Sequence, residues 1–185
     1  MRHLILIRHA EAVSSASGLP DIQRPLSSHG QAQARLMGEW LRYAGLKPDR
    51  IVCSHSARTT ATARIMARAL DMDASAITED PRIYLQPASN LIPLIHALPD
   101  DYRRVFVIGH NPDISALIGE LSGEILDEQP PCTVASLTFP SDSWAYVGEG
   151  NGGLDFCIHP DRYQLSPWWP GANRVSNTVN PPHRA

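Results

Sequence analysis

The chain has 185 residues, 43% of them hydrophobic and 19% charged, and its 16 basic and 19 acidic residues give a formal net charge of −3. This length suits one sizeable core rather than two domains, and the composition is that of an ordinary globular protein. The charges are intermixed without a basic run, and no apolar run approaches the roughly 20 residues of a membrane span, so we expect neither a nucleic-acid partner nor a membrane segment.

Short apolar runs alternate with amphipathic stretches through the first two thirds of the chain. The sequence predicts strands over residues 4–7, 51–53 and 104–109 and helices over 28–43 and 57–70. A further helix is expected to start with Asn111 as N-cap and Pro112 as the first helical residue, and to end near Gly123. This alternation is typical of an α/β sheet.

The pattern changes after Pro130. Residues 133–139, 144–147 and 154–158 are predicted as strands of an antiparallel meander that extends the sheet at one edge. From residue 159 onward Pro, Asn, Arg and Ser dominate without periodicity around a pair of tryptophans. We therefore expect one domain over residues 1–160 and an irregular Pro- and Trp-rich tail over 161–185.

The cysteines and the first apolar run favour a cytoplasmic location. Three cysteines without CxxC spacing argue against a disulfide framework and against a thiolate metal site. The run Leu4 to Ile7 is short and is followed by Arg8 and His9 instead of a small-residue cleavage site, so no export signal is evident.

Arginines and histidines follow three predicted strands where each strand ends. Arg8 and His9 end the first, Arg58 follows the second and His110 follows the third. Ligands of open α/β sheets bind beyond the carboxyl ends of the strands, so we expect these side chains to converge. Arginine fits phosphate oxygens, a neutral imidazole can attack phosphorus, and a second histidine can donate to the oxyanion. The set predicts phosphoryl transfer without a metal.

Each of these residues taken alone also has an ordinary structural explanation, and only their common position at strand ends favours a site. Cys53 and Arg58 suggest a second chemistry, that of the cysteine phosphatase loop. Four residues separate them where that loop has five, and none of the four is a glycine that lets the backbone wrap a phosphate. Cys53 is therefore expected to be a buried strand-end residue, whereas His55 is a candidate substrate contact.

The segment from Leu4 to Glu11 resembles the opening signature of the histidine phosphatase superfamily, which includes the phosphoglycerate mutases, with Ala10 where glycine is usual. Further segments are similar to the short SixA-type phosphohistidine phosphatases, and the match covers roughly residues 1–160. These segments are Asp21-Ile-Gln-Arg24-Pro25-Leu26-Ser27, Gly30-Gln-Ala-Gln-Ala, Ser54-His-Ser-Ala-Arg58-Thr59-Thr-Ala-Thr-Ala63 and Gly109-His110-Asn111-Pro112.

The resemblance implies a mostly parallel sheet with helices on both faces, antiparallel edge strands near the C-terminus, and no cofactor or metal. It implies that His9 is phosphorylated in a covalent intermediate and that three residues complete the phosphate pocket, namely Arg8, Arg58 and His110. The predicted substrate-binding residues are Arg24, Asn111 and Asp21.

Many larger relatives carry a glutamate proton donor after the third strand of their own sheet, in a segment that corresponds to residues 81–86 of this chain. Residues 81–86 hold no carboxylate, so this donor is missing. Glu79 and Asp80 precede that segment, and Asp21 is a third candidate, so the acid is one of these or none. An alkoxide leaving group needs such an acid. An imidazole, whose conjugate acid has a pKa of about 6.5, departs with less help.

The sequence therefore predicts a phosphohydrolase that forms phosphohistidine at His9 and acts on a phosphohistidine of a signalling or phosphotransfer protein. One alternative is a phosphomonoesterase acting on a small phosphorylated metabolite. Another is a non-catalytic phosphate-binding or interaction module that uses the C-terminal tail as its contact surface. The oligomeric state stays open.

Overall fold

A computed structural model describes residues 1–163 of the chain. Six strands in this part form a single sheet in the order β3-β2-β4-β1-β5-β6. The strands are β1 (Arg2–Arg8), β2 (Arg50–Cys53), β3 (Ile77–Glu79), β4 (Arg104–Gly109), β5 (Val134–Phe139) and β6 (Gly153–Ile158). The helices are α1 (Ser28–Tyr43), α2 (Ala57–Ala69), α3 (Ala88–His96), α4 (Asp113–Ser122) and α5 (Pro160–Tyr163).

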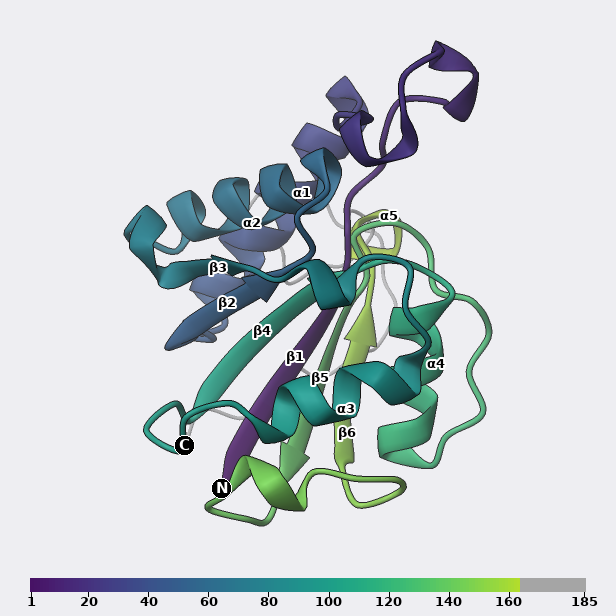
Figure 1. Ribbon diagram of the computed structural model, residues 1–185. Coiled ribbons are helices and arrows are strands. Elements are labelled where there is room, and N and C mark those ends of the chain that lie inside the picture. Colours follow the sequence, from purple (N-terminus) through teal and green to yellow (C-terminus); the bar gives the residue numbers. More distant parts are fainter. Residues whose placement is uncertain (164–185) are drawn as a thin grey trace.

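The sheet has the predicted mixed topology. Strands β3, β2, β4 and β1 are parallel, β5 runs antiparallel to β1, and β6 runs antiparallel to β5 at the edge. Helices α1 and α2 cover one face and α3 and α4 cover the other (Figure 1). The predicted fold class, an α/β fold with a mostly parallel sheet and antiparallel edge strands near the C-terminus, is confirmed.

The central strand β1 is apolar on both faces because helices cover both. Leu4 and Leu6 join the core beneath α3 and α4, whereas Ile5 and Ile7 join the core beneath α1 and α2. All four side chains are fully buried. Side chains of a strand alternate between the two faces, so a continuous apolar run is what a strand between two helical layers requires.

The structure corrects one predicted strand. Trp144–Tyr146 is a turn of 3-10 helix instead of part of the meander. Trp144 is fully buried, and its indole Nε1 donates to the Tyr102 carbonyl at 2.9 Å while its backbone nitrogen donates to Asp100 Oδ1 at 2.9 Å. These contacts hold the segment against the loop before β4, so it does not pair with the sheet.

Two further differences concern helices and short strands. Helix α4 begins at Asp113 with Pro112 in the N-cap position, so the predicted cap at Asn111 is displaced by one residue. Strand β3, which has three residues, and helix α3, whose internal Pro93 is unusual in a helix, were not predicted from the sequence.

The described part of the chain ends shortly after β6. Helix α5 covers the first three residues of the predicted tail, and residues 164–185 lie outside the described residues. Between residues 1 and 163 no helix combines the length and apolar character needed to cross a membrane. The cytoplasmic location stays a prediction.

The segment after β1 is fixed by both helices of one layer. The backbone nitrogen of Ala10 donates to Thr62 Oγ1 of α2 at 3.2 Å, and that of Glu11 donates to Gln33 Oε1 of α1 at 3.0 Å. Ala10 is fully buried, so its methyl group is accommodated. At Gly30 a Cβ would lie only 1.9 Å from the Glu11 carbonyl oxygen, so only glycine permits this approach.

We expect Gly30→Ala to lower the free energy of unfolding by about 1–3 kcal/mol, because the added methyl group forces α1 and residues 9–11 apart. Urea denaturation measures the loss. The matched control is Gly148→Ala, where the nearest neighbouring atom would be at 3.7 Å. Equal stability of the two variants would contradict the steric argument.

Candidate active site

The parallel strands bring the predicted site residues to one edge of the sheet. Arg8 of β1 pairs with Gly109 of β4, and the backbone nitrogen of His9 donates to the Gly109 carbonyl at 3.0 Å. Strand β2 pairs with the other side of β4. A cavity of about 470 Å³ beyond these strand ends, the catalytic pocket, is lined by all seven predicted residues: Arg8, His9, Asp21, Arg24, Arg58, His110 and Asn111.

The tautomer of His9 is determined by its neighbours. Its Nδ1 lies 2.7 Å from the carbonyl oxygen of Ala10, which can only accept, so Nδ1 carries the proton. The lone pair is then on Nε2, which accepts from Arg58 Nε at 3.2 Å. Burial, with further contributions from Arg58 and Arg8, lowers the pKa of His9 to about 4. At neutral pH His9 is an uncharged imidazole whose Nε2 can attack an electrophile.

Arg58 is the central cation of the pocket and is only 3% exposed. Besides the bond to His9, its Nη2 lies 3.2 Å from Nδ1 of His110. Its Nη1 donates to the Asp21 carbonyl oxygen at 2.6 Å, and its Nη2 donates to Asp21 Oδ2 at 2.9 Å. Arg58 thus links both histidines to the loop that carries Asp21, and its guanidinium has the donor geometry that phosphate oxygens require.

His110 is held between Arg58 and Ser54. Its Nδ1 accepts from Arg58, so Nε2 carries the proton and donates to Ser54 Oγ at 2.9 Å. Burial, together with His9 and Arg58, lowers the pKa of His110 to about 3, so it is neutral as well. Its ring meets that of His9 edge-on, with centroids 5.1 Å apart. In this arrangement His110 orients Arg58, and the role of oxyanion donor stays a prediction.

The carboxylate of Asp21 accepts hydrogen bonds from three side chains. Its Oδ2 accepts from the Tyr84 hydroxyl at 2.7 Å as well as from Arg58, and its Oδ1 accepts from Arg24 Nη2 at 2.7 Å. These donors, with Tyr84 contributing most, hold the pKa of Asp21 well below its usual range. Asp21 is therefore ionised at any working pH and is a poor proton donor.

Tyr84 contacts the site residues although its position in the sequence does not predict it. Its ring lies edge-on to His110 at 5.3 Å and to His55 at 5.5 Å between centroids, and the Arg58 guanidinium lies 6.0 Å from its ring centroid. It belongs to residues 81–86, the segment without a carboxylate. A tyrosine has no distinctive spacing in a sequence, so only its place in the fold reveals its contacts.

Arg8 and Asn111 line the catalytic pocket and share one hydrogen-bond acceptor, the Gln129 carbonyl. Arg8 Nη1 donates to the Gln129 carbonyl and lies 3.6 Å from Glu128 Oε1. Asn111 Nδ2 donates to the same Gln129 carbonyl at 2.7 Å, and Asn111 Oδ1 accepts from Ser115 at 2.9 Å. Asn111 thereby fixes the loop against which Arg8 rests.

The other candidate proton donors point elsewhere. Glu79 is 3.6 Å from Arg64, and Asp80 is bound by Arg82 at 2.6 Å; neither lines the catalytic pocket. Glu11 does line it, but its Oε1 accepts from the Ser27 hydroxyl at 2.6 Å.

Neither thiolate nor metal chemistry gains support from the geometry. Cys53 is fully buried, and burial raises the pKa of its thiol to about 12, as expected of a structural strand-end residue. Over residues 1–163, no three or more His, Cys, Asp or Glu side chains gather into a group that could hold a metal ion. The predicted lack of a cofactor stays a prediction.

Comparison with known proteins points in the same direction as the geometry. The model of the histidine phosphatase superfamily (branch 1) matches residues 4–83. An uncharacterized chloroplastic protein of Arabidopsis thaliana is 31% identical over 174 residues, covering 86% of this chain and 78% of the relative. The phosphohistidine phosphatase SixA of Escherichia coli is 25% identical over 165 residues, covering 88% of this chain and 97% of SixA.

A solved structure supports the same relationship. The candidate SixA phosphohistidine phosphatase of Nakamurella multipartitia superposes with a TM-score of 0.71 at 29% identity, covering 86% of this chain and 96% of the other. The similarity in sequence and in fold therefore covers most of the chain.

We expect the His9 imidazole to stay neutral down to about pH 5 and to protonate with a midpoint near pH 4, because burial and two arginines oppose its charge. NMR titration of its ring signals measures this, with free imidazole in the same tube as the reference. Unfolded histidine protonates near pH 6.5 while native His9 does not, so the unfolded state binds more protons and stability falls as the pH drops from about 6.5 to 4. A midpoint near 6.5 would contradict the buried, neutral nucleophile.

Proposed function

The chain belongs to the histidine phosphatase superfamily and is a phosphatase, and we propose that it removes the phosphoryl group from a phosphohistidine side chain of another protein. The observation that carries this proposal is the state of the carboxylates around the catalytic pocket. Asp21 is held ionised, Glu11 is engaged by Ser27, and Glu79 and Asp80 lie outside the pocket. No carboxyl group among these four is placed to protonate an alkoxide, which suits a leaving group that departs without a strong acid.

In the first step the Nε2 lone pair of His9 attacks phosphorus in line with the leaving nitrogen. A new bond forms between phosphorus and His9 Nε2, and the bond between phosphorus and the substrate imidazole breaks. The electron pair leaves with the substrate nitrogen. Because the other ring nitrogen of the substrate carries a proton, the departing imidazole is neutral and needs no further proton. The backbone contact of His9 Nδ1 to Ala10 aims Nε2 into the pocket before substrate arrives.

Positive charge around the phosphoryl oxygens is the contribution of the arginines. Arg8, Arg24 and Arg58 line one cavity and bear fixed charges, so they can neutralise the oxygens without a proton transfer. When the phosphoryl group binds, its oxygens accept hydrogen bonds from the Arg58 nitrogens that contact Asp21 and His110 in this structure.

In the second step water attacks the phosphohistidine formed at His9. The bond between phosphorus and His9 Nε2 breaks, the neutral imidazole is restored, and inorganic phosphate leaves. The low pKa of His9 makes this nitrogen a good leaving group, because its lone pair has little affinity for a proton.

The names of relatives support the choice of substrate only as an analogy. The Escherichia coli relative is called a phosphohistidine phosphatase, and it is matched over almost its whole length. A small-molecule phosphomonoesterase is disfavoured because the four carboxyl groups named above are engaged or outside the pocket and Glu128 is paired with Arg8. A non-catalytic module is disfavoured by the presence of the whole His-Arg set in one cavity.

We expect His9→Ala to abolish the phosphoenzyme and to lower kcat by at least about 10³-fold, because it removes the nitrogen on which the phosphoenzyme forms. Incubation with ³²P-phosphohistidine protein, followed by alkaline quench and electrophoresis, detects the label. Wild type is expected to carry alkali-stable, acid-labile label and His9→Ala none. A labelled, active His9→Ala protein would show that the nucleophile is another residue.

We expect wild type to hydrolyse phosphohistidine with a kcat/KM at least about 100-fold above that for an alkyl phosphate, since general acid assistance to an alkoxide is worth about that factor. Asp21→Asn is expected to lower both rates by a similar factor of about ten, because it loosens Arg58 and Arg24. If Asp21 were the acid, the variant would lose activity on the ester and keep it on phosphohistidine. A wild-type enzyme that prefers the ester would refute the proposed substrate class.

A further inference from the structure

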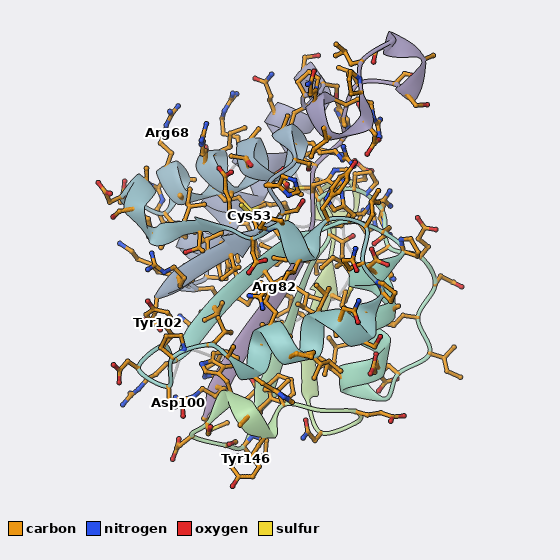
Figure 2. The ribbon with its side chains drawn as sticks, viewed as in Figure 1. Cys53, Arg68, Arg82, Asp100, Tyr102 and Tyr146 are labelled. Atoms are coloured by element: carbon orange, nitrogen blue, oxygen red, sulfur yellow. The ribbon has the colours of Figure 1, made fainter. Side chains whose placement is uncertain are left out.

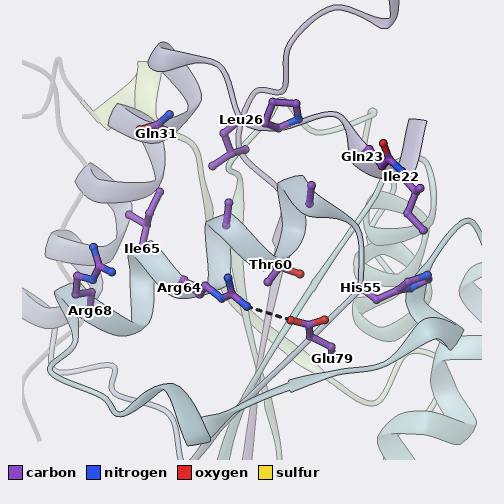
Figure 3. A pocket seen from close by; sticks show the side chains of 13 residues that line it. Ile22, Gln23, Leu26, Gln31, His55, Thr60, Arg64, Ile65, Arg68 and Glu79 are labelled. Carbon is purple, nitrogen blue, oxygen red and sulfur yellow. Dashed lines mark ion pairs between the residues drawn. The ribbon is translucent and has the colours of Figure 1, made fainter. Parts of the chain in front are cut away.

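A second hollow, the α2 groove, opens beside the catalytic pocket. Its volume is about 720 Å³. Figure 3 shows its lining, which comes from residues 22–31, from α2 and from the end of β3. The groove and the pocket share the same short segments, because Ile22 and Gln23 line the groove while Asp21 lines the pocket, and Ala57 lines the groove while Arg58 lines the pocket.

The groove leads away from the catalytic pocket along one face of α2. The α2 residues that line it recur at helical spacing: Ala57, Thr60, Ala61, Arg64, Ile65 and Arg68. At a rise of 1.5 Å per residue this stripe is about 16 Å long. A single phosphorylated side chain reaches only the pocket, so a groove of this length suits a further segment of chain attached to it.

The lining combines apolar side chains with a charged end. The apolar part is formed by Ile22, Leu26 and Ile65, of which Ile65 lies next to the arginines. At the far end Arg64 and Arg68 are both exposed. Arg64 lies 3.6 Å from Glu79, which balances its charge, whereas Arg68 forms no ion pair within residues 1–163 and projects outward from α2 (Figure 2). The mechanism above uses none of these residues.

A contact joins the two hollows. His55 lines the groove, and its ring packs edge-on against Tyr84, which in turn donates to Asp21 in the pocket. The Nδ1 atom of His55 is buried without a hydrogen-bond partner among the described residues. The junction thus connects the lining of the groove to the carboxylate of the pocket through two aromatic rings.

We propose that the α2 groove docks a surface helix of the phosphohistidine-bearing protein, with apolar side chains over Ile65 and Leu26 and a carboxylate at Arg68. The proposal rests on the proposed function, because it places the phosphohistidine of the same helix in the catalytic pocket. Two helices lying side by side meet every three to four residues, which matches the stripe on α2. Arg68 is ten residues beyond Arg58, so the carboxylate belongs about 15 Å from the phosphorylated ring, three turns along the partner helix.

The charge at the far end selects the partner. An exposed pair contributes little to affinity, but a misplaced like charge opposes docking, so Arg68 discriminates acidic helices from basic ones. Glu79 does not repel the partner's carboxylate because Arg64 already pairs with it.

Two synthetic Ala-rich helical peptides test the proposal. Each carries one histidine, phosphorylated chemically, and apolar residues one and two turns away. In the glutamate peptide, glutamates stand ten and eleven residues from the histidine on both sides. In the lysine peptide, lysines stand at the same positions. Free phosphohistidine is the substrate that cannot reach the groove. The enzymes are wild type, Arg68→Glu and the control Arg103→Glu, whose exposed arginine lies before β4 at the opposite end of the sheet.

We expect wild type to hydrolyse the glutamate peptide with a kcat/KM about fivefold above that of the lysine peptide, through KM. Arg68→Glu reverses this preference and leaves the rate on free phosphohistidine unchanged, and Arg103→Glu behaves as wild type. Equal rates on both peptides, or a preference that survives Arg68→Glu, would overturn docking in the groove while the phosphatase function stands. Hydrolysis of alkyl esters but of no phosphohistidine compound would overturn the proposed function and the docking with it.

Discussion

Burial of the Arg58 guanidinium is the constraint on which the rest of the site depends. A buried cation is costly unless its donors are satisfied, and here a carboxylate, a backbone carbonyl and two imidazole nitrogens satisfy them. The same charge lowers the pKa of both histidines and of Asp21. Together with burial, which contributes most, this cation keeps the nucleophile neutral, and it also contacts the second histidine and the Asp21 loop.

That electrostatic arrangement also limits the chemistry. A pocket with several fixed positive charges attracts a phosphoryl group and keeps nearby carboxylates ionised. Such carboxylates carry no proton that they could donate to the leaving group. Tyr84 fills the position after β3 and commits its hydroxyl to Asp21. The arrangement suits substrates whose leaving atom is already a weak base, and a phosphoramidate nitrogen is of that kind. Substrate choice then depends on what surrounds the phosphoryl group, which is where the α2 groove contributes.

Much of the fold was predictable because its signals are local. The apolar runs of β1 and β4 and the helical patterns of α1 and α2 depend on near neighbours in the chain, and the four elements appear where expected. The segment at Trp144 was predicted wrongly because its conformation depends on Asp100 and Tyr102, more than forty residues away. Helix α3 and strand β3 were missed because a proline and a length of three residues weaken local patterns.

By itself the sequence determined that Arg8, His9, Arg58 and His110 follow strands, and the rule that parallel strands share an edge was enough to predict that they meet. Only the tertiary structure decided what each does there. The tautomer of His9 follows from its position beside a carbonyl, the ionised state of Asp21 from three donors that belong to separate segments, and the part played by Tyr84 from its place above His110. Hydrogen bonds and pKa values depend on burial and on distances of a few ångströms, whether the partner is the next residue, as Ala10 is to His9, or remote, as Tyr84 is from Asp21. Burial and these distances exist only once the chain is folded.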